Sequence, residues 1–130
     1  MNTDETRIRG LKHEETTSRI IGSAFEVHNL LGYGFLEKVY QRALQVERIK
    51  RGSRAEMETA IKVGYKGIVV GEYDADLLVD GSVIVEIKVA KTYNPEDEAP
   101  LLNELKATGI GVGMLVNFGR ERVDYKRMVL

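Results

Sequence analysis

The chain has 130 residues, a length typical of one domain, and 43% of them are hydrophobic, which is enough to bury a core. Its formal net charge is −1, whereas most dedicated nucleic-acid binders carry a basic excess, so the overall charge counts against tight, non-specific DNA binding. Cysteine is absent, which excludes disulfides, thiolate catalysis and zinc–thiolate sites. No apolar run reaches the length of about 18 residues that predicts a transmembrane helix. Residues 1–15 are polar and lack the apolar stretch of a secretion signal, so we expect a cytoplasmic protein with no membrane contact.

Two helices are expected at the start of the chain. Residues 1–13 are predicted to be a flexible segment, and one domain is predicted over 14–130. Apolar residues recur with helical spacing from Glu14 to Leu31, and the glycines at 32 and 34 end this helix because glycine tolerates the left-handed conformation. A second helix is predicted from Leu36 to Arg51. Its buried stripe is expected to consist of Leu36, Val39, Tyr40, Ala43 and Val46.

Strands dominate the second half. Three are predicted over 56–65, 68–79 and 82–90, with Asp80 and Gly81 as a hairpin turn and Gly71 at a bend or bulge. Asn94 and Pro95 predict the start of a helix that runs to Gly109, before strands at 112–117 and 123–130. The strand over 82–90 is apolar on both faces, which predicts a central position covered on both sides. The order α, α, β, β, β, α, β, β indicates a mixed sheet flanked by helices, in a single α/β or α+β domain.

Three charged residues interrupt the hairpin over 68–90. Asp76 lies on the first strand, and Glu86 and Lys88 lie two residues apart on the second, so they point to the same face. Charges inside apolar strands are unfavourable unless they are paired or bind a metal. Mg²⁺ prefers carboxylate oxygens and lowers the pKa of a bound water, and a nearby lysine can hold or deprotonate that water. This is the layout of a magnesium-dependent phosphodiesterase site.

Simpler alternatives stay open on the residues alone. The acid-x(9)-acid-x-lysine pattern is loose, and on a surface hairpin Glu86 and Lys88 would form an exposed ion pair worth less than about 1 kcal/mol. Glu37 is either an acid favoured by the dipole at a helix start or a third carboxylate near the same metal. His28 is either a hydrogen-bonded core histidine or a donor to a site carboxylate. The basic residues over 42–54 form either a solvated helix face or a patch that contacts phosphate.

The chain also resembles a known family. Gly34, Glu37 and Tyr40 form the motif of the GxxExxY proteins, a group similar to the PD-(D/E)XK nuclease superfamily. The resemblance extends from about residue 19 to residue 127 and includes the segments 73–79 and 83–88, which carry the hairpin charges. It implies a restriction-endonuclease-like core, αβββαβ, with an extra N-terminal helix.

The resemblance also implies roles for particular residues. Asp76 and Glu86 would bind Mg²⁺ (or Mn²⁺), Lys88 would be the catalytic lysine, and Glu37 would be an additional catalytic acid. His28 and Tyr40 are candidates for residues that support these side chains. The implied activity is metal-dependent hydrolysis of phosphodiester bonds in nucleic acid, with DNA favoured over RNA. A homodimer would give so small a domain more surface for a duplex.

One departure from the family concerns the second core helix. Relatives usually carry glutamine and tyrosine where this chain has Pro100 and Glu104. A proline inside the helix removes a backbone hydrogen bond, and Glu104 would repel phosphate if it faced the site. Either the helix begins later than expected, or the nucleic-acid surface is weakened. The alternative function is therefore a catalytically weak or inactive module that binds nucleic acid or protein. A self-associating structural domain is a third alternative.

Overall fold

The computed structural model describes residues 13–130. The elements follow in the order expected from the sequence: α2 (Glu14–Leu31), α3 (Glu37–Lys50), β1 (Ala55–Tyr65), β2 (Ile68–Val79), β3 (Val83–Lys88), η1 (Pro95–Asp97), α4 (Glu98–Thr108), β4 (Val112–Phe118) and β5 (Val123–Val129). The flexible segment expected over 1–13 lies, except for His13, outside the described residues. No helix in the described part of the chain is long and apolar enough to cross a membrane.

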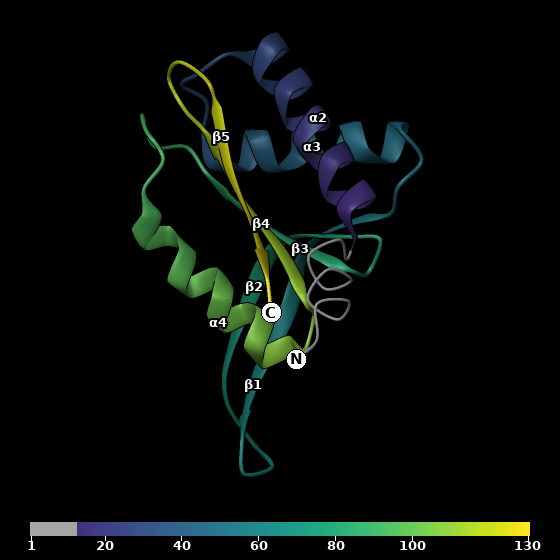
Figure 1. Ribbon diagram of the computed structural model, residues 1–130, viewed down its shortest axis with the longest axis vertical. Coiled ribbons are helices and arrows are strands. Elements are labelled where there is room, and N and C mark those ends of the chain that lie inside the picture. The colour runs from purple at the N-terminus through teal and green to yellow at the C-terminus, as the bar shows by residue number, and fades with distance from the viewer. Residues whose placement is uncertain (1–12) are drawn as a thin grey trace, which may run out of the picture.

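Within residues 13–130, five strands form one mixed sheet in the order β1-β2-β3-β4-β5 (Figure 1). The first three strands make an antiparallel meander, β3 and β4 are parallel, and β5 returns antiparallel to β4. A parallel pair needs a long crossover connection, which α4 supplies. The mixed α/β single domain expected from the sequence is confirmed.

The sheet is covered on both faces. Helices α2 and α3 pack on one face and α4 packs on the other (Figure 1). The side chains of β3 divide between the two cores, since Val83 and Val85 join the cluster under α2 and α3, while Ile84 joins Leu101 of α4. The predicted central, doubly covered strand is confirmed. Charged side chains on such a strand have to be accommodated inside the fold.

The buried face of α3 differs from the expectation. Leu36, Val39 and Val46 are exposed, although all three were expected in the core, whereas Tyr40 is buried as expected. Besides Tyr40, the helix buries Gln41, Leu44 and Arg48. Gln41 donates to a backbone carbonyl and Arg48 to serine oxygens, which offsets part of the cost of burial, although Arg48 Nε is buried without a partner. Hydropathy alone therefore placed three exposed side chains in the core, while Tyr40 and Ala43 pack there as predicted.

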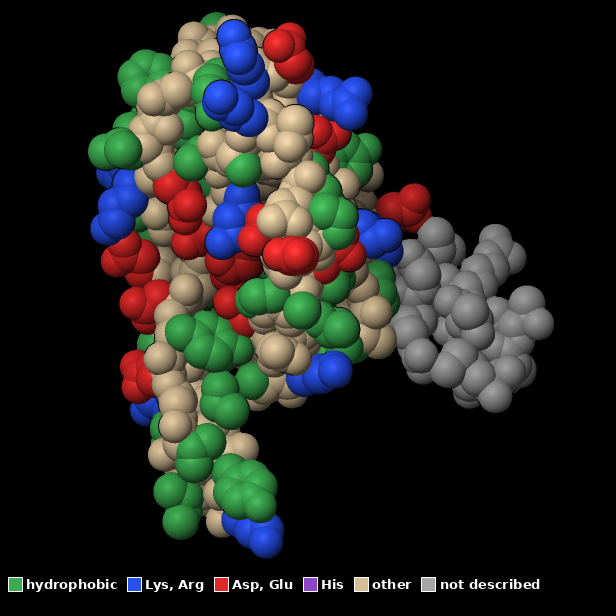
Figure 2. Space-filling view, turned by 90° about the vertical axis from the view of Figure 1, so that its left-hand side faces the viewer, with side chains coloured by type: hydrophobic (Ala, Val, Ile, Leu, Met, Phe, Trp, Pro, Cys, Tyr) green, Lys and Arg blue, Asp and Glu red, His purple; other side chains and the backbone are tan. Residues whose placement is uncertain are grey.

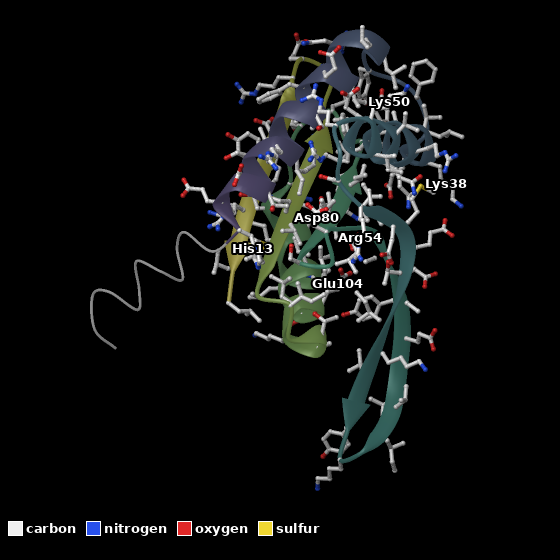
Figure 3. All side chains as sticks on the ribbon, turned by 90° about the vertical axis from the view of Figure 1, so that its right-hand side faces the viewer. His13, Lys38, Lys50, Arg54, Asp80 and Glu104 are labelled. Carbon is white, nitrogen blue, oxygen red and sulfur yellow. The ribbon has the colours of Figure 1, made fainter. Side chains whose placement is uncertain are left out.

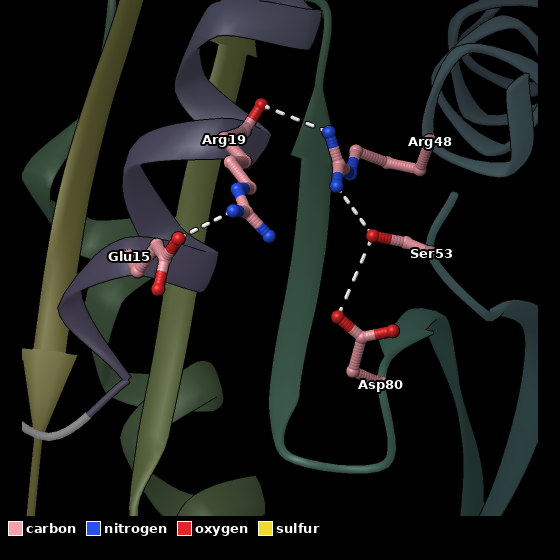
Figure 4. Close-up of polar contacts among 5 residues, drawn as sticks. All are labelled: Glu15, Arg19, Arg48, Ser53 and Asp80. Atoms are coloured by element: carbon pink, nitrogen blue, oxygen red, sulfur yellow. Dashed lines mark hydrogen bonds and ion pairs between the residues drawn. The ribbon is translucent and has the colours of Figure 1, made fainter. Parts of the chain in front are cut away.

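Arg48 joins α2, α3 and the turn between β2 and β3 (Figure 4). Its guanidinium donates to Ser23 Oγ at 3.1 Å and to Ser53 Oγ, and the Ser53 hydroxyl donates in turn to Asp80 Oδ2 at 3.4 Å. The Asp80 carboxylate also accepts the backbone N–H of Arg54 at 2.9 Å. Because Arg48 is only 1% exposed, it is not available to a phosphate group. Arg48 is therefore not part of the phosphate-contacting patch considered for the basic residues over 42–54.

We expect Arg48→Ala to lower the free energy of unfolding by about 2–4 kcal/mol, because it leaves a cavity and removes the donor from buried hydroxyls. Arg42→Ala removes the same charge from an exposed position of α3 and should change stability by no more than about 0.5 kcal/mol. Urea denaturation of both variants measures the difference. Equal losses in the two variants would contradict the structural role of Arg48.

The hairpin of β1 and β2 extends beyond the body of the domain as an arm (Figures 1 and 2). A register shift between Val63 and Gly64 leaves Val70 of β2 without a partner residue, next to Gly71. This confirms the irregularity predicted at Gly71. Several apolar side chains of the arm are exposed: Tyr65, Ile68, Val69 and Val70.

Helix α4 begins later than the sequence suggested. The Asn94 side chain accepts the backbone N–H of Glu96 at 3.0 Å, as expected of a cap, but the first turn is the 3-10 helix η1. Pro100 consequently lies in the first turn of α4, where a missing backbone N–H breaks no intrahelical hydrogen bond. Of the two alternatives raised by Pro100, the later helix start is the one observed.

Candidate active site

The candidate site lies where β2 separates from β3. Pairing between the two strands stops at Leu77, and the preceding residue, Asp76, uses Oδ2 to accept the backbone N–H of Ile87 at 2.7 Å. Side-chain alternation breaks at the same point, because Ala75 belongs to the core under α4 and Leu77 to the core under α2 and α3. On β1, Glu58 has a left-handed φ of 56° beside this break. Asp76 therefore sits at a kink, with its carboxylate fixed between two strands.

Helix α3 supports the kink and brings a second acid to it. Gln41 Nε2 donates to the backbone carbonyl of Asp76 at 2.9 Å. Glu37, one turn earlier on the same helix, is half-buried and interacts electrostatically with both Asp76 and Lys88. Burial and then the charge of Asp76 raise the pKa of Glu37, while Lys88 acts in the opposite direction. Three of the residues singled out in the sequence are thus close enough to influence one another.

Tyr40 holds the segment that leads into Glu37. Its hydroxyl donates to the carbonyl of Gly32 at 2.5 Å, and its ring stacks on Phe118 with centroids 4.7 Å apart. Gly34 has a φ of 115°, which only glycine adopts without strain. The three motif residues therefore have distinct physical tasks: the glycine turns the chain, the tyrosine holds the turn, and the glutamate begins the helix.

Glu86 faces α4 and meets another acid there. Its carboxyl group lies within hydrogen-bonding distance of the Glu104 carboxyl. Burial, followed by Glu104 and Asp76, raises the pKa of Glu86 well above its ordinary value, and burial also raises the pKa of Glu104. One oxygen of each group, Glu86 Oε1 and Glu104 Oε2, is buried without a hydrogen-bond partner. The positive charge of Lys88 lowers the pKa of both Glu37 and Glu104, against the effect of burial.

Glu104 was considered in the sequence only as a source of repulsion. The signal for its burial was its position beside Leu101 and Leu105, which form the apolar stripe of α4. His28 lies at a different contact, with Nε2 2.8 Å from the backbone carbonyl of Gly119 in the loop between β4 and β5. Of the two alternatives for His28, this contact fits the hydrogen-bonded core histidine and not the donor to a site carboxylate.

The side chains fit a hard divalent cation in their chemistry. Within residues 13–130, no group of three or more histidine and acidic side chains already has the arrangement of a metal site. However, a buried carboxylate oxygen without a donor is unfavourable, and Glu86 Oε1 is such an atom in a cluster that also contains Asp76. Carboxylate oxygens are the ligands that Mg²⁺ and Mn²⁺ prefer. The cluster therefore suits a cation whose entry would reorient these side chains.

Comparison with known proteins places the chain in a family. A family model described as the PD-(D/E)XK nuclease superfamily matches residues 14–128. The chain belongs to the PD-(D/E)XK nuclease superfamily. Among solved structures, the crystal structure of SSO0001 has a TM-score of 0.52 at 17% identity, over 92% of this chain and 60% of that one. The chain thus spans about 60% of the length of that protein and shares its fold. No curated protein matches the chain significantly.

A groove on the surface of this PD-(D/E)XK domain is lined in part by Glu104. It has a volume of about 370 Å³ and is lined by Tyr73, Asp74, Pro100, Asn103 and Glu104. On the face that carries α4, acidic side chains gather across the middle of the molecule (Figure 2). A larger cleft of about 510 Å³ lies between the segment after β3 and the β4–β5 loop, and its lining includes Lys91 and Arg122. The smaller groove is the one that includes a residue of the carboxylate cluster.

Proposed function

We propose that the protein is a nuclease that requires Mg²⁺ (or Mn²⁺) to hydrolyse phosphodiester bonds in nucleic acid, with DNA preferred over RNA. Membership of the nuclease superfamily supports the reaction class. The observation that carries the proposal is the convergence of two acids from adjacent strands, Asp76 and Glu86, with Lys88 on a doubly covered strand. Partly buried charged groups with shifted pKa values of this kind gather at functional sites.

The roles follow from the contacts of each side chain. Asp76 and Glu86 would hold the ion, and the N–H of Ile87 orients the Asp76 carboxylate. When bound, Mg²⁺ supplies Lewis acidity toward a phosphoryl oxygen and lowers the pKa of a bound water. Lys88 holds the attacking water and neutralises charge that develops on the phosphate. Glu37, whose pKa is raised by burial and by Asp76, would assist as an additional acid beside Lys88.

We further propose that the chain is a GxxExxY protein within the superfamily. Gly34, Glu37 and Tyr40 carry the motif, and each has a task that depends on its residue type. The motif places Glu37 at the first position of α3, next to the kink that holds Asp76. This provides a physical reason for the motif spacing, because the tyrosine one turn into the helix fixes the turn before it.

A second candidate function is a binding module that has lost turnover. The position of Glu104 favours it, because a further carboxylate beside Glu86 adds negative charge where a phosphate would approach. The net charge of −1 is in line with weak nucleic-acid binding. In that case the domain would bind a metal ion or a partner without hydrolysis.

Cleavage assays with controlled metal content separate the two functions. The purified chain is incubated with single- and double-stranded DNA and RNA in Mg²⁺, Mn²⁺ or EDTA. Cleavage that depends on metal and stops in EDTA is the expected result. Metal binding by calorimetry without hydrolysis of any of these substrates would support the binding module. Neither metal binding nor cleavage would contradict both the site and the activity.

A further inference from the structure

Glu104 is a buried acid that the proposed nuclease mechanism does not use. It is only 8% exposed, although glutamate is almost never buried to this degree without a partner. Glu104 belongs to α4 and is labelled in Figure 3. Its carboxyl group interacts with that of Glu86 through a hydrogen bond. Its Oε2 atom has no hydrogen-bond partner, and no ion pair between residues 13 and 130 includes it. The structure leaves this buried carboxylate oxygen unused.

The neighbouring charges do not balance Glu104. Asp76 carries negative charge toward it, Lys88 carries positive charge toward it, and Glu86 interacts with it through a side-chain hydrogen bond. Once Glu86 is ionised as well, the three acids would hold three negative charges against one positive charge. A divalent cation restores neutrality more closely than any side chain in the cluster, and it offers a partner to the orphaned oxygens.

We propose that Glu104 is a third carboxylate ligand of the metal site, acting together with Asp76 and Glu86. This inference rests on the proposed metal-dependent function and extends it to a residue on α4. The three carboxylates come from β2, β3 and α4, so the ion would join the two strands to the helix that covers them. Binding requires the contact between Glu86 and Glu104 to open around the cation.

The groove described above leads from solvent to Glu104. It is lined by Glu104 and by polar groups of Tyr73, Asp74 and Asn103, and it opens to solvent beside the first turn of α4. Pro100, in the first turn of α4, also lines this groove.

Binding of Mn²⁺ alone, measured by isothermal titration calorimetry, tests the inference without reliance on activity. Glu104→Gln keeps the shape of the side chain but removes an anionic ligand, so we expect its affinity for Mn²⁺ to fall at least about tenfold. Glu104→Asp retains a carboxylate and should show an intermediate affinity. Glu72→Gln removes the same charge from an exposed position of β2 and should stay within about twofold of the unmodified protein. The rise in melting temperature on addition of Mn²⁺ gives a second readout and should be smaller in Glu104→Gln than in the control.

The outcomes distinguish this inference from the proposed function. If Glu104→Gln binds Mn²⁺ as tightly as the control while Asp76→Asn does not bind, Glu104 is not a ligand and the nuclease proposal stands. If the unmodified protein does not bind Mn²⁺, both proposals are overturned. Should Glu104→Gln fail to fold, an affinity of Glu104→Asp equal to that of the unmodified protein would count against ligation. A loss in Glu104→Asp together with an unchanged control supports it.

Discussion

Replacement of Lys88 by alanine should abolish the cleavage of nucleic acid while the fold and the affinity for metal are retained. Lys88 is the cation that acts on Glu37 and Glu104 within the cluster, so its loss removes the positive charge expected to stabilise the transition state. Effects of this kind reduce turnover by about 10²–10⁴-fold. Cleavage rates at saturating Mg²⁺, with circular dichroism as the test of folding, measure the effect.

Asp76→Ala should abolish cleavage for a different reason, because it removes a proposed metal ligand. Its Mn²⁺ affinity should therefore fall, whereas that of Lys88→Ala should not. Lys106→Ala, at an exposed position of α4, removes the same charge as Lys88→Ala and should cleave at the rate of the unmodified protein. Folded Lys88→Ala and Asp76→Ala variants with unchanged cleavage rates would show that these roles are wrong.

The metal-free protein should lose stability as the pH rises from about 5 to about 8. Burial, Glu104 and Asp76 raise the pKa of Glu86, so the native chain keeps a proton that the unfolded chain releases near the ordinary pKa of 4.5. When the native state binds more protons than the unfolded state, the free energy of unfolding falls with increasing pH. One such proton corresponds to a slope of up to about 1.4 kcal/mol per pH unit. Urea denaturation in EDTA at several pH values measures this slope.

Glu86→Gln should flatten this pH dependence and stabilise the metal-free protein at the upper end of the range. The amide cannot ionise, so the native and unfolded states no longer differ in proton binding at this position. Saturating Mg²⁺ should also flatten the fall of the unfolding free energy with pH in the unmodified protein, because a bound ion favours ionised carboxylates. Glu72→Gln should keep the original slope. The same slope in Glu86→Gln as in Glu72→Gln would contradict the origin of the effect in Glu86.

Local patterns in the sequence were sufficient for the order of the elements and for the central strand. Periodicity, the Asp80–Gly81 turn and the Asn94 cap depend on residues close together along the chain, and the structure agrees with them. The apolar residues on both faces of β3 similarly predicted two layers of helices. The acid-x(9)-acid-x-lysine pattern predicted which side chains to examine. It could not establish that they meet.

Contacts between distant segments decided which side chains are buried on α3 and which charged residues meet at the candidate site. The buried stripe of α3 was mispredicted in part because Gln41 donates to a backbone carbonyl and Arg48 to serines of distant segments, which hydropathy does not register. The kink at Asp76 depends on where β2 leaves β3, and the contact of Glu104 with Glu86 depends on how α4 docks on the sheet. The sequence by itself thus determined the elements and the chemical types available to a site. Only the tertiary structure decided which of them share it, because strand register and helix docking bring together residues that no local pattern connects.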